Sequence, residues 1–287
     1  MPMLSKVIPA LTVHSWGGFG SQLFTALVVI RLKKRFPRRR IRVILHTAGI
    51  TRRENEFDFH KLGIHFSQVD DFSTVDKQDA KQTSASLKCF KLKTFLKTSI
   101  VNTLDYLHIV KRANNDISLD LIKVWTISLR GHYTQLTFDK DSIISLFEIL
   151  FIEKLYPDAF PYSLAIHYRL GDLLKVKRHS LISPKRIEGL LSKLNLGEVN
   201  GIILSDSPRD ELFDYISRSD DLAGFKLASL DHITTLAICI SAKTFIGTGA
   251  KLSVWCAIFR HFILGKESFL PKELKWMSDS GLNSNWY

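Results

Sequence analysis

The chain has 287 residues, a formal net charge of +12, and 45% hydrophobic residues. This length and apolar content exclude a single small domain and a disordered chain, and they predict two domains of ordinary size. The excess of positive charge predicts an anionic partner: phosphate, nucleic acid or an acidic membrane.

In chain order, residues 11–16 are predicted to form a strand, followed by a glycine turn and a helix over 22–36 that Pro37 ends. A strand over 41–46 completes a βαβ unit. Residues 70–90 are polar and predict a surface excursion. A helix over 141–155 then precedes a proline-rich stretch. We therefore place a first, Rossmann-like domain at 1–155 and a second at 156–287.

The second half repeats the alternation of strands and helices. Strands are predicted at 163–168, 201–205, 225–229 and 243–247, and helices at 208–218, 231–241 and 250–263, with a further helix opened by Ser183 and Pro184. Asp206, Ser207 and Pro208 are expected to cap the helix that follows them. This rhythm indicates an α/β fold with a parallel sheet covered on both faces and ligands at the carboxyl ends of its strands.

Cysteine usage and hydropathy limit the compartment. Cys89, Cys239 and Cys256 form no CxxC or Cys/His cluster, so we expect buried free thiols, a reducing compartment and no zinc site. The first ten residues lack the apolar core of a signal peptide. The most apolar stretches, 143–152 and 254–264, are too short to span a bilayer. We expect a cytoplasmic protein.

Residues 31–42 contain eight lysines and arginines and no acid. One interpretation is a solvated helix end and loop. The other is docking to anionic lipid headgroups or to a lipid-pyrophosphate acceptor, on the inner face of the cytoplasmic membrane. We expect no nucleic-acid partner, because no zinc finger, helix-turn-helix or aromatic RNA platform accompanies the run.

Three predicted strand ends carry polar residues. At the first, Arg169 follows an apolar strand and is suited to grip two phosphate oxygens, with Asp172 orienting it; a salt-bridged loop arginine is the alternative. At the second, Ser205 and Asp206 have a helix cap as their alternative. The third is the small-residue turn 247–253, where a helix N-terminus offers N–H groups to a phosphate without the spacing of a P-loop.

The glycine-rich turn 17–22 in the first half lacks the full GxGxxG spacing, so a dinucleotide fingerprint is not indicated. It is interpreted either as a tight strand-to-helix turn or as a close backbone approach to a ligand.

Taken in order, these motifs resemble the fucosyltransferase superfamily, and most of all the bacterial alpha-1,2-fucosyltransferases. GGFGSQLFT at 17–25 is similar to the family's GGLGNQMFQ-type loop, and residues 132–135 (HYTQ) to its GY-x-Q element. HYRLGD at 167–172 is similar to HxRRxD, and Ser205-Asp206 to the family's SD strand end. Residues 231–236 and 245–255 (FIGTGAKLSVW) are similar to the final Asp-x-x-x-x-Met/Leu and IANSSFSWW elements.

The resemblance implies a GT-B architecture, two Rossmann-like domains facing a cleft, and inverting transfer of fucose from GDP-fucose to a glycan hydroxyl without a metal ion or other cofactor. It implies that Arg169 binds the diphosphate, that Asp231 reads the nucleobase and that 248–253 holds the β-phosphate. The sites assigned on this basis are catalytic Arg169, His167 and Asp172; donor-binding Gly18, Gly20, Ser205, Asp206, Asp231, Thr248, Gly249, Ala250, Lys251, Leu252 and Ser253; and acceptor-side His14, Tyr133 and Gln135.

The sequence departs from the family at three places: Leu170 replaces the second motif arginine, Ser21 replaces the loop asparagine, and Ala250-Lys251-Leu252 replaces the SSF core. Lys251 offers a replacement positive charge. These departures leave the donor sugar open between fucose and another deoxyhexose such as rhamnose.

Two classes of function therefore remain. One is an enzyme, acting on a lipid-linked glycan in bacterial O-antigen or capsule synthesis, with His14, Asp172 and His132 as candidates for the general base. The other is a non-catalytic protein that binds phosphorylated ligands or an anionic membrane.

Overall fold

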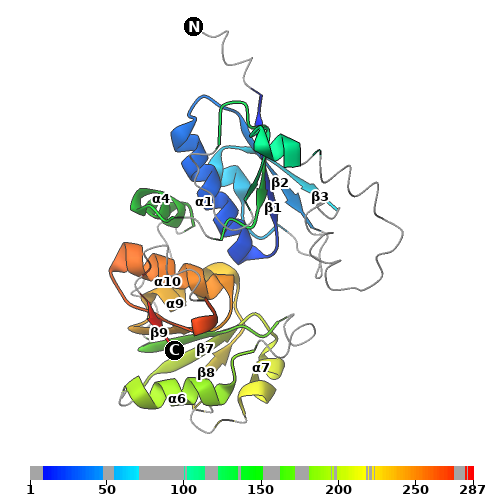
Figure 1. Ribbon diagram of the computed structural model, residues 1–287. Coiled ribbons are helices and arrows are strands. Elements are labelled where there is room, and N and C mark those ends of the chain that lie inside the picture. Colours follow the sequence, from blue (N-terminus) through cyan, green and yellow to red (C-terminus); the bar gives the residue numbers. More distant parts are fainter. Residues whose placement is uncertain are drawn as a thin grey trace, which may run out of the picture. The chain divides into compact units, whose positions relative to one another are not determined.

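The computed structural model describes residues 9–47, 55–70, 100, 102–113, 122–134, 137–150, 162–171, 181–194, 196, 199–217, 219, 222, 224–274, 282 and 284–287. The chain divides into two compact units, Met1–Thr137 and Phe138–Tyr287 (Figure 1). Each contains a parallel sheet, which confirms the predicted α/β class with two Rossmann-like domains.

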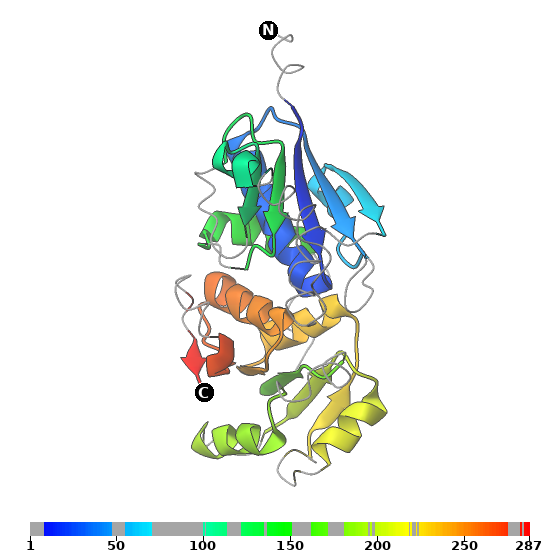
Figure 2. The same ribbon diagram turned by 45° about the vertical axis from the view of Figure 1, so that its right-hand side comes forward.

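The first unit holds a five-stranded sheet in the order β3-β2-β1-β5-β4. Its central strand β1 (Leu11–Trp16) is buried throughout and pairs in parallel with β2 (Ile41–His46) and β5 (Ser128–Gly131). The outer strands are β3 (His65–Val69) and β4 (Val110–Ala113). Helix α1 (Phe19–Arg35) lies along the sheet (Figure 2), and the short 3-10 helix η2 (Phe59–Leu62) packs on it.

The second unit holds a six-stranded sheet in the order β11-β10-β9-β6-β7-β8. Numbered within the unit, this is the Rossmann order 6-5-4-1-2-3. Its strands are β6 (Leu164–Tyr168), β7 (Gly201–Ser205), β8 (Lys226–Ala228), β9 (Thr244–Gly247), β10 (Phe269–Leu270) and β11 (Asn285–Trp286).

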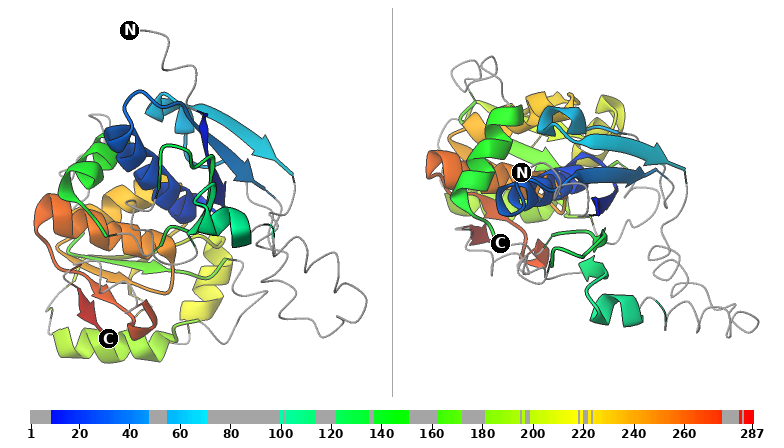
Figure 3. Two further views of the ribbon diagram at one scale, coloured as in Figure 1. Left: turned by 45° about the horizontal axis from the view of Figure 1, so that its top comes forward. Right: turned by 90° about the horizontal axis from the view of Figure 1, so that it is seen from above.

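Helices cover both faces of this second sheet, as predicted. On one face lie α6 (Pro184–Leu194) and α7 (Arg209–Ile216), and on the other α9 (His232–Ser241) and α10 (Lys251–Leu264) (Figure 3). Proline occupies the first position of α6, where its missing N–H costs no helical hydrogen bond. Gly265 ends α10 in the left-handed conformation, at φ 63°.

The division of the chain falls earlier than the predicted boundary at 155/156, because α4 (Lys140–Leu150) packs on the second unit. Phe147 meets Phe259 edge-on with ring centroids 5.4 Å apart, and Phe138 meets Trp255 at 6.4 Å. Aromatic packing of this kind contributes beyond its buried area, and it ties the segment before the predicted boundary to α10.

Most predicted strands and helices agree with the structure to within a few residues. Helix α1 begins at Phe19 rather than Gln22, because the turn takes only Gly17 and Gly18. Residues 71–90 of the predicted excursion and 151–155 of the predicted helix lie outside the described residues.

Cys239 and Cys256 are buried and free, as expected, whereas Cys89 lies outside the described residues. Within the part of the chain that the structure describes, no helix has both the length and the apolar character needed to cross a bilayer.

Candidate functional site

The second sheet reverses its winding between β6 and β9, which are neighbours in the sheet but far apart in the chain. The loops that leave the carboxyl ends of these two strands are joined by hydrogen bonds. The Arg169 N–H donates to Thr248 Oγ1 at 2.7 Å, and the Thr248 N–H donates to the His167 carbonyl at 3.0 Å. Such a switch point is where open α/β sheets bind ligands.

The Arg169 side chain forms an ion pair with Asp206, which follows β7. The same carboxylate accepts the Leu170 N–H at 3.1 Å. The two side chains keep 21% and 15% of their exposure, so the pair is held in place while still reaching the surface. Asp206 therefore orients Arg169, the role expected of Asp172, which lies outside the described residues.

This arrangement corrects the predicted cap of the helix after β7. The N-cap of α7 is Pro208, and no side chain caps it. Asp206 faces Leu170 instead, and Ser207 Oγ accepts the Gly171 N–H at 2.7 Å. The polar residues after β7 thus organise the loop after β6. The buried Ser205 hydroxyl accepts the Ser207 N–H at 3.2 Å and supports this turn.

Helix α10 begins at the switch point with an N-cap, Ala250, that has no side-chain oxygen. Its first turn contains no acid, and its first residue is Lys251, whose pKa burial lowers to about 8. A lysine at the positive end of a helix dipole is electrostatically unfavourable. A bound anion would relieve this repulsion and accept hydrogen bonds from the first-turn N–H groups.

Small residues bring the backbone close to this position. A Cβ added at Gly247 would lie 2.6 Å from Cβ of Ser253, so glycine permits the close packing of β9 on α10. Gly249 is different: it is exposed, and an added Cβ would meet nothing within 4 Å. Leu252 and Ala250 are buried at 8% and 7% exposure, so their side chains belong to the packing, whereas the backbone of Gly249 faces outward.

His167 is only 2% exposed, and its Nδ1 lies 2.7 Å from Ser253 Oγ. Burial lowers the pKa of His167 to about 3, with further lowering by the charges of Arg169 and His232. The imidazole is therefore neutral at pH 7. In this geometry it fixes the first turn of α10 against β6.

We expect His167 to make the free energy of unfolding fall with acid. Unfolding returns the pKa of His167 from about 3 to the ordinary 6.5. Between pH 3 and pH 6.5 the imidazole is therefore protonated in the unfolded chain but not in the folded one. The contribution is intact above pH 6.5 and declines below it by about 1.4 kcal/mol per pH unit. Urea unfolding of the wild type and of His167→Gln between pH 7 and 5 measures it. The variant should show the shallower decline, and equal slopes would contradict the assignment.

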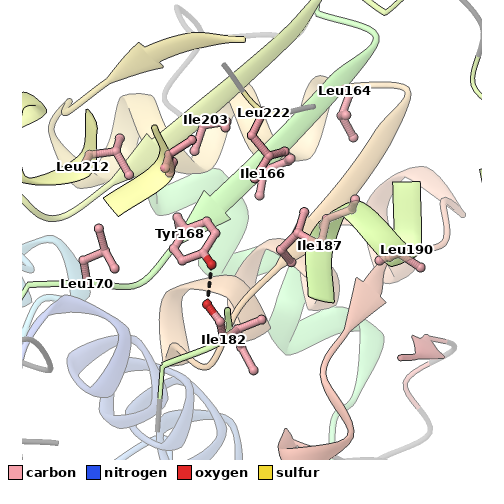
Figure 4. Packing of buried hydrophobic residues seen from close by; sticks show 12 residues of the cluster. Leu164, Ile166, Tyr168, Leu170, Ile182, Ile187, Leu190, Ile203, Leu212 and Leu222 are labelled. Carbon is pink, nitrogen blue, oxygen red and sulfur yellow. Dashed lines mark hydrogen bonds between the residues drawn. The ribbon is translucent and has the colours of Figure 1, made fainter. Parts of the chain in front are cut away.

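Leu170, at the position where the resemblance has a second arginine, is completely buried. It lies in the core with Tyr168, Ile166 and Leu212 (Figure 4), where the Tyr168 hydroxyl donates to the Ile182 carbonyl. Burial of an unpaired guanidinium here would be costly. The chain therefore presents one arginine, not two, at the end of β6.

Asp231 is the N-cap of α9. Its Oδ1 accepts the Ile233 and Thr234 N–H groups at 3.0 and 2.9 Å, and its Oδ2 accepts the Thr234 hydroxyl. Partial burial raises the pKa of Asp231, but these hydrogen bonds lower it by more. The side chain remains exposed, so the cap leaves the carboxylate at the surface.

The glycine turn of the first unit binds a carboxylate from the same chain, that of Glu56. Gly17 has φ +88°, Gly18 is the N-cap of α1, and Gly20 lies buried in the first turn. The Glu56 carboxylate accepts the Phe19 N–H at 2.6 Å, and the Gln22 amide oxygen accepts the Glu56 N–H at 3.0 Å. Sequence reasoning missed Glu56, because nothing in its neighbourhood indicates that it folds back onto the glycine turn.

Histidines gather at the carboxyl edge of the first sheet. His14 Nδ1 lies 2.8 Å from His46 Nε2, and the Trp16 indole N–H donates to His132 Nε2 at 3.0 Å. Tyr133, at φ 55°, donates its hydroxyl hydrogen bond to the His14 carbonyl. His14 and Tyr133 are buried, so both stabilise this edge. Gln135 lies outside the described residues.

The structure thus brings Arg169, Asp206 and the turn 247–253 to one edge of the second sheet, and it places His14 and Tyr133 at the edge of the first. Among the described residues, no group of three or more His, Cys, Asp or Glu side chains is arranged to hold a metal ion.

No protein-family model matches the chain, and no curated protein matches it significantly. Solved structures similar to it include the NodZ alpha-1,6-fucosyltransferase soaked with GDP-fucose, at TM-score 0.39 and 10% identity over 87% of this chain and 92% of that one. A glycosyl transferase family 9 protein from Veillonella parvula DSM 2008 has a TM-score of 0.40 and 9% identity over 92% of this chain and 81% of that one. The apo form of POFUT1 has a TM-score of 0.37 and 12% identity over 98% of each chain.

Proposed function

We propose that this chain is a glycosyltransferase that binds a sugar nucleotide at the switch point of its second sheet. The observation that carries the proposal is that the Arg169 backbone N–H is hydrogen-bonded to Thr248, in the turn before α10, while its guanidinium is held by Asp206. Helix α10 has no side-chain cap and begins with Lys251. A guanidinium, an ammonium and the backbone N–H groups at a helix N-terminus together match a diphosphate. The order of motifs along the sequence, which resembles the fucosyltransferases, supports the same assignment.

In the proposed reaction, the oxygen of an acceptor hydroxyl attacks the anomeric carbon from the face opposite the diphosphate. The bond to the diphosphate oxygen breaks, its electron pair leaves with the diphosphate, and the hydroxyl proton passes to a base. Arg169 and the α10 N-terminus stabilise the charge that grows on the leaving group. Because the hydroxyl attacks in one step from the face opposite the leaving group, we propose that transfer inverts the anomeric centre. Because Arg169, Lys251 and the helix N-terminus supply positive charge, we propose that it proceeds without a metal ion.

For the donor we propose GDP-fucose, with the exposed Asp231 carboxylate facing the guanine, as the sequence resemblance implies. The second donor to test is another nucleotide-deoxyhexose, because Leu170 is buried and leaves a single arginine at the end of β6. For the acceptor we propose a glycan of bacterial surface polysaccharide, O-antigen or capsule, carried on a lipid at the cytoplasmic face of the membrane.

A two-part experiment tests the proposal. A panel of nucleoside diphosphates in a thermal-shift assay should show GDP raising the Tm, since a ligand of the folded state stabilises it. Product formation from GDP-fucose with EDTA present should then show turnover without metal. Nucleotide binding without turnover of any donor would instead favour a non-catalytic binding protein.

Two glycine variants locate the nucleotide. A Cβ at Gly249 meets no neighbour within 4 Å, so we expect Gly249→Leu to keep the Tm of the wild type. The leucine side chain would stand beside the α10 N-terminus and occupy the space of the diphosphate, so GDP should no longer raise the Tm. Gly189→Leu, on α6, also meets nothing within 4 Å and is the matched control. An unchanged GDP shift in Gly249→Leu would place the nucleotide elsewhere.

A further inference from the structure

The first unit exposes a set of large apolar side chains at the amino edge of its sheet, the end from which β4 and β5 begin. Tyr106 is 84% exposed and Trp125 54%. Surface apolar residues that occur singly need no explanation, but a cluster marks an interaction site. The members of this cluster, called the Trp125 patch, are Tyr106, Leu107, Val124, Trp125 and Ile127.

Hydrogen bonds show that the two segments of the patch lie side by side. The Trp125 indole N–H donates to the Leu107 carbonyl at 3.2 Å. The Thr126 hydroxyl donates to the His108 carbonyl at 2.6 Å, and the Ile127 N–H to the Ile109 carbonyl at 2.8 Å. The segments before β4 and before β5 are thereby fixed as one surface, and the apolar side chains stand on a rigid base.

The basic run 31–42 is joined directly to this patch. Arg39 is buried, and its guanidinium donates to the carbonyls of Lys123, at 3.1 Å, and Thr126. It therefore clamps the loop after α1 to the loop that carries Trp125. Its neighbours Arg38 and Arg40 are exposed. The acid beside Tyr106, Asp105, is paired with Lys111 at 3.3 Å, so Arg38 and Arg40 give this edge its positive charge.

We infer that the Trp125 patch and the basic run together dock the protein onto an anionic membrane. Tryptophan and tyrosine favour the level of the lipid headgroups, and aliphatic side chains insert just beneath it. Arginines next to them gain from the negative surface of an acidic bilayer. The segments that carry the patch lead into β4 and β5 at the amino edge of the sheet, opposite the edge that carries the glycine turn.

The chemistry favours a bilayer over the other anionic surface, nucleic acid. Leu107, Val124 and Ile127 offer neither a stacking plane nor a hydrogen bond to a base, whereas they gain free energy from burial among lipid chains. The inference does not rest on the proposed transferase activity. It concerns residues of the first unit alone, so it stands or fails separately.

Vesicle sedimentation with the full chain tests the inference. We expect binding to vesicles that contain phosphatidylglycerol, weak binding to vesicles of phosphatidylcholine alone, and loss of binding at high salt. Trp125→Ala/Tyr106→Ala and Arg38→Glu/Arg40→Glu should each lower the partition coefficient about tenfold or more. The substituted side chains are exposed, and Tm measurements verify that each variant folds.

Matched controls come from the second unit. Phe213, 58% exposed, provides the aromatic control Phe213→Ala, and the exposed pair on α6 provides Lys185→Glu/Lys193→Glu, with the same change of charge. We expect both to bind as the wild type does. Quenching by bromine-labelled lipids should in addition be smaller in Trp125→Phe than in the wild type.

Three outcomes would overturn the inference: no binding of the wild type to anionic vesicles, equal losses in the patch and control variants, or a change of oligomeric state in the patch variants alone, which would make the patch an interface between copies. Preference for an RNA or DNA oligonucleotide over the vesicles in direct competition would overturn it as well.

Discussion

Replacing Arg169 by alanine is expected to lower kcat/KM for transfer from GDP-fucose by about 10²- to 10³-fold, equivalent to about 3–4 kcal/mol of transition-state stabilisation. The reason is that the guanidinium opposes charge that grows on the diphosphate as the glycosidic bond breaks. If Arg169 stabilised the bound donor and the transition state equally, its removal would raise KM and leave kcat unchanged. For this reason kcat and KM are measured separately. We expect the larger part of the loss in kcat.

Companion variants separate charge from orientation. Arg169→Lys keeps a charge but loses the planar fork that grips two oxygens, and we expect a loss between those of the wild type and the alanine variant. Asp206→Asn keeps Arg169 but removes the carboxylate that holds it, so a smaller loss is expected. Arg169→Ala leaves the Asp206 carboxylate without its ion-pair partner, which should lower the free energy of unfolding. The double variant Arg169→Ala/Asp206→Ala removes that carboxylate as well, so it should recover this stability but not the activity. Full activity in Arg169→Ala would reject the mechanism.

Strands β6, β7 and β9 of the second unit were predictable because they are short apolar runs bounded by turn residues. GIILS at 201–205 and the residues before Arg169 give this signal, and the structure confirms both strands. Strand β5, with the sequence SLRG, and the two-residue strands β10 and β11 give none. They form because neighbouring strands offer hydrogen bonds, which a single segment does not reveal.

The site was predictable only as a set of strand ends. That Arg169 follows a buried strand is visible in the sequence, but its pairing with Asp206 depends on β7 lying beside β6. Sequence proximity pointed to Asp172 and to a helix cap instead. Likewise, Glu56 reaches the α1 N-terminus only because the chain returns after β2. Partners brought together by sheet order leave no local pattern, so they appear only in three dimensions.

The largest effect on stability is expected at Arg260, which lies within the apolar stretch 254–264. The residue is 1% exposed, and burial lowers the pKa of its guanidinium to about 10, so it is charged at pH 7. Its nitrogens donate to five carbonyls and a hydroxyl, those of Cys239, Ile240, Ala242, Lys243, Glu267 and Ser268. One side chain thus binds the end of α9 and the segment before β10 to α10.

We expect Arg260→Leu to lower the free energy of unfolding by at least about 3–5 kcal/mol, because it removes the donors and leaves buried carbonyls unsatisfied. Urea unfolding of the wild type, Arg260→Leu and the control variant Arg186→Ala measures this loss. Arg186→Ala is the control: that partly exposed arginine donates two hydrogen bonds to the exposed Glu273, at 2.6 and 3.0 Å, and one to the Tyr287 main-chain oxygen at 2.8 Å. Because water can replace these partners, we expect a smaller loss, below about 2 kcal/mol. Comparable losses in both variants would mean that burial of the Arg260 hydrogen bonds adds no stability, and that the junction of α9, α10 and β10 is held by apolar packing alone.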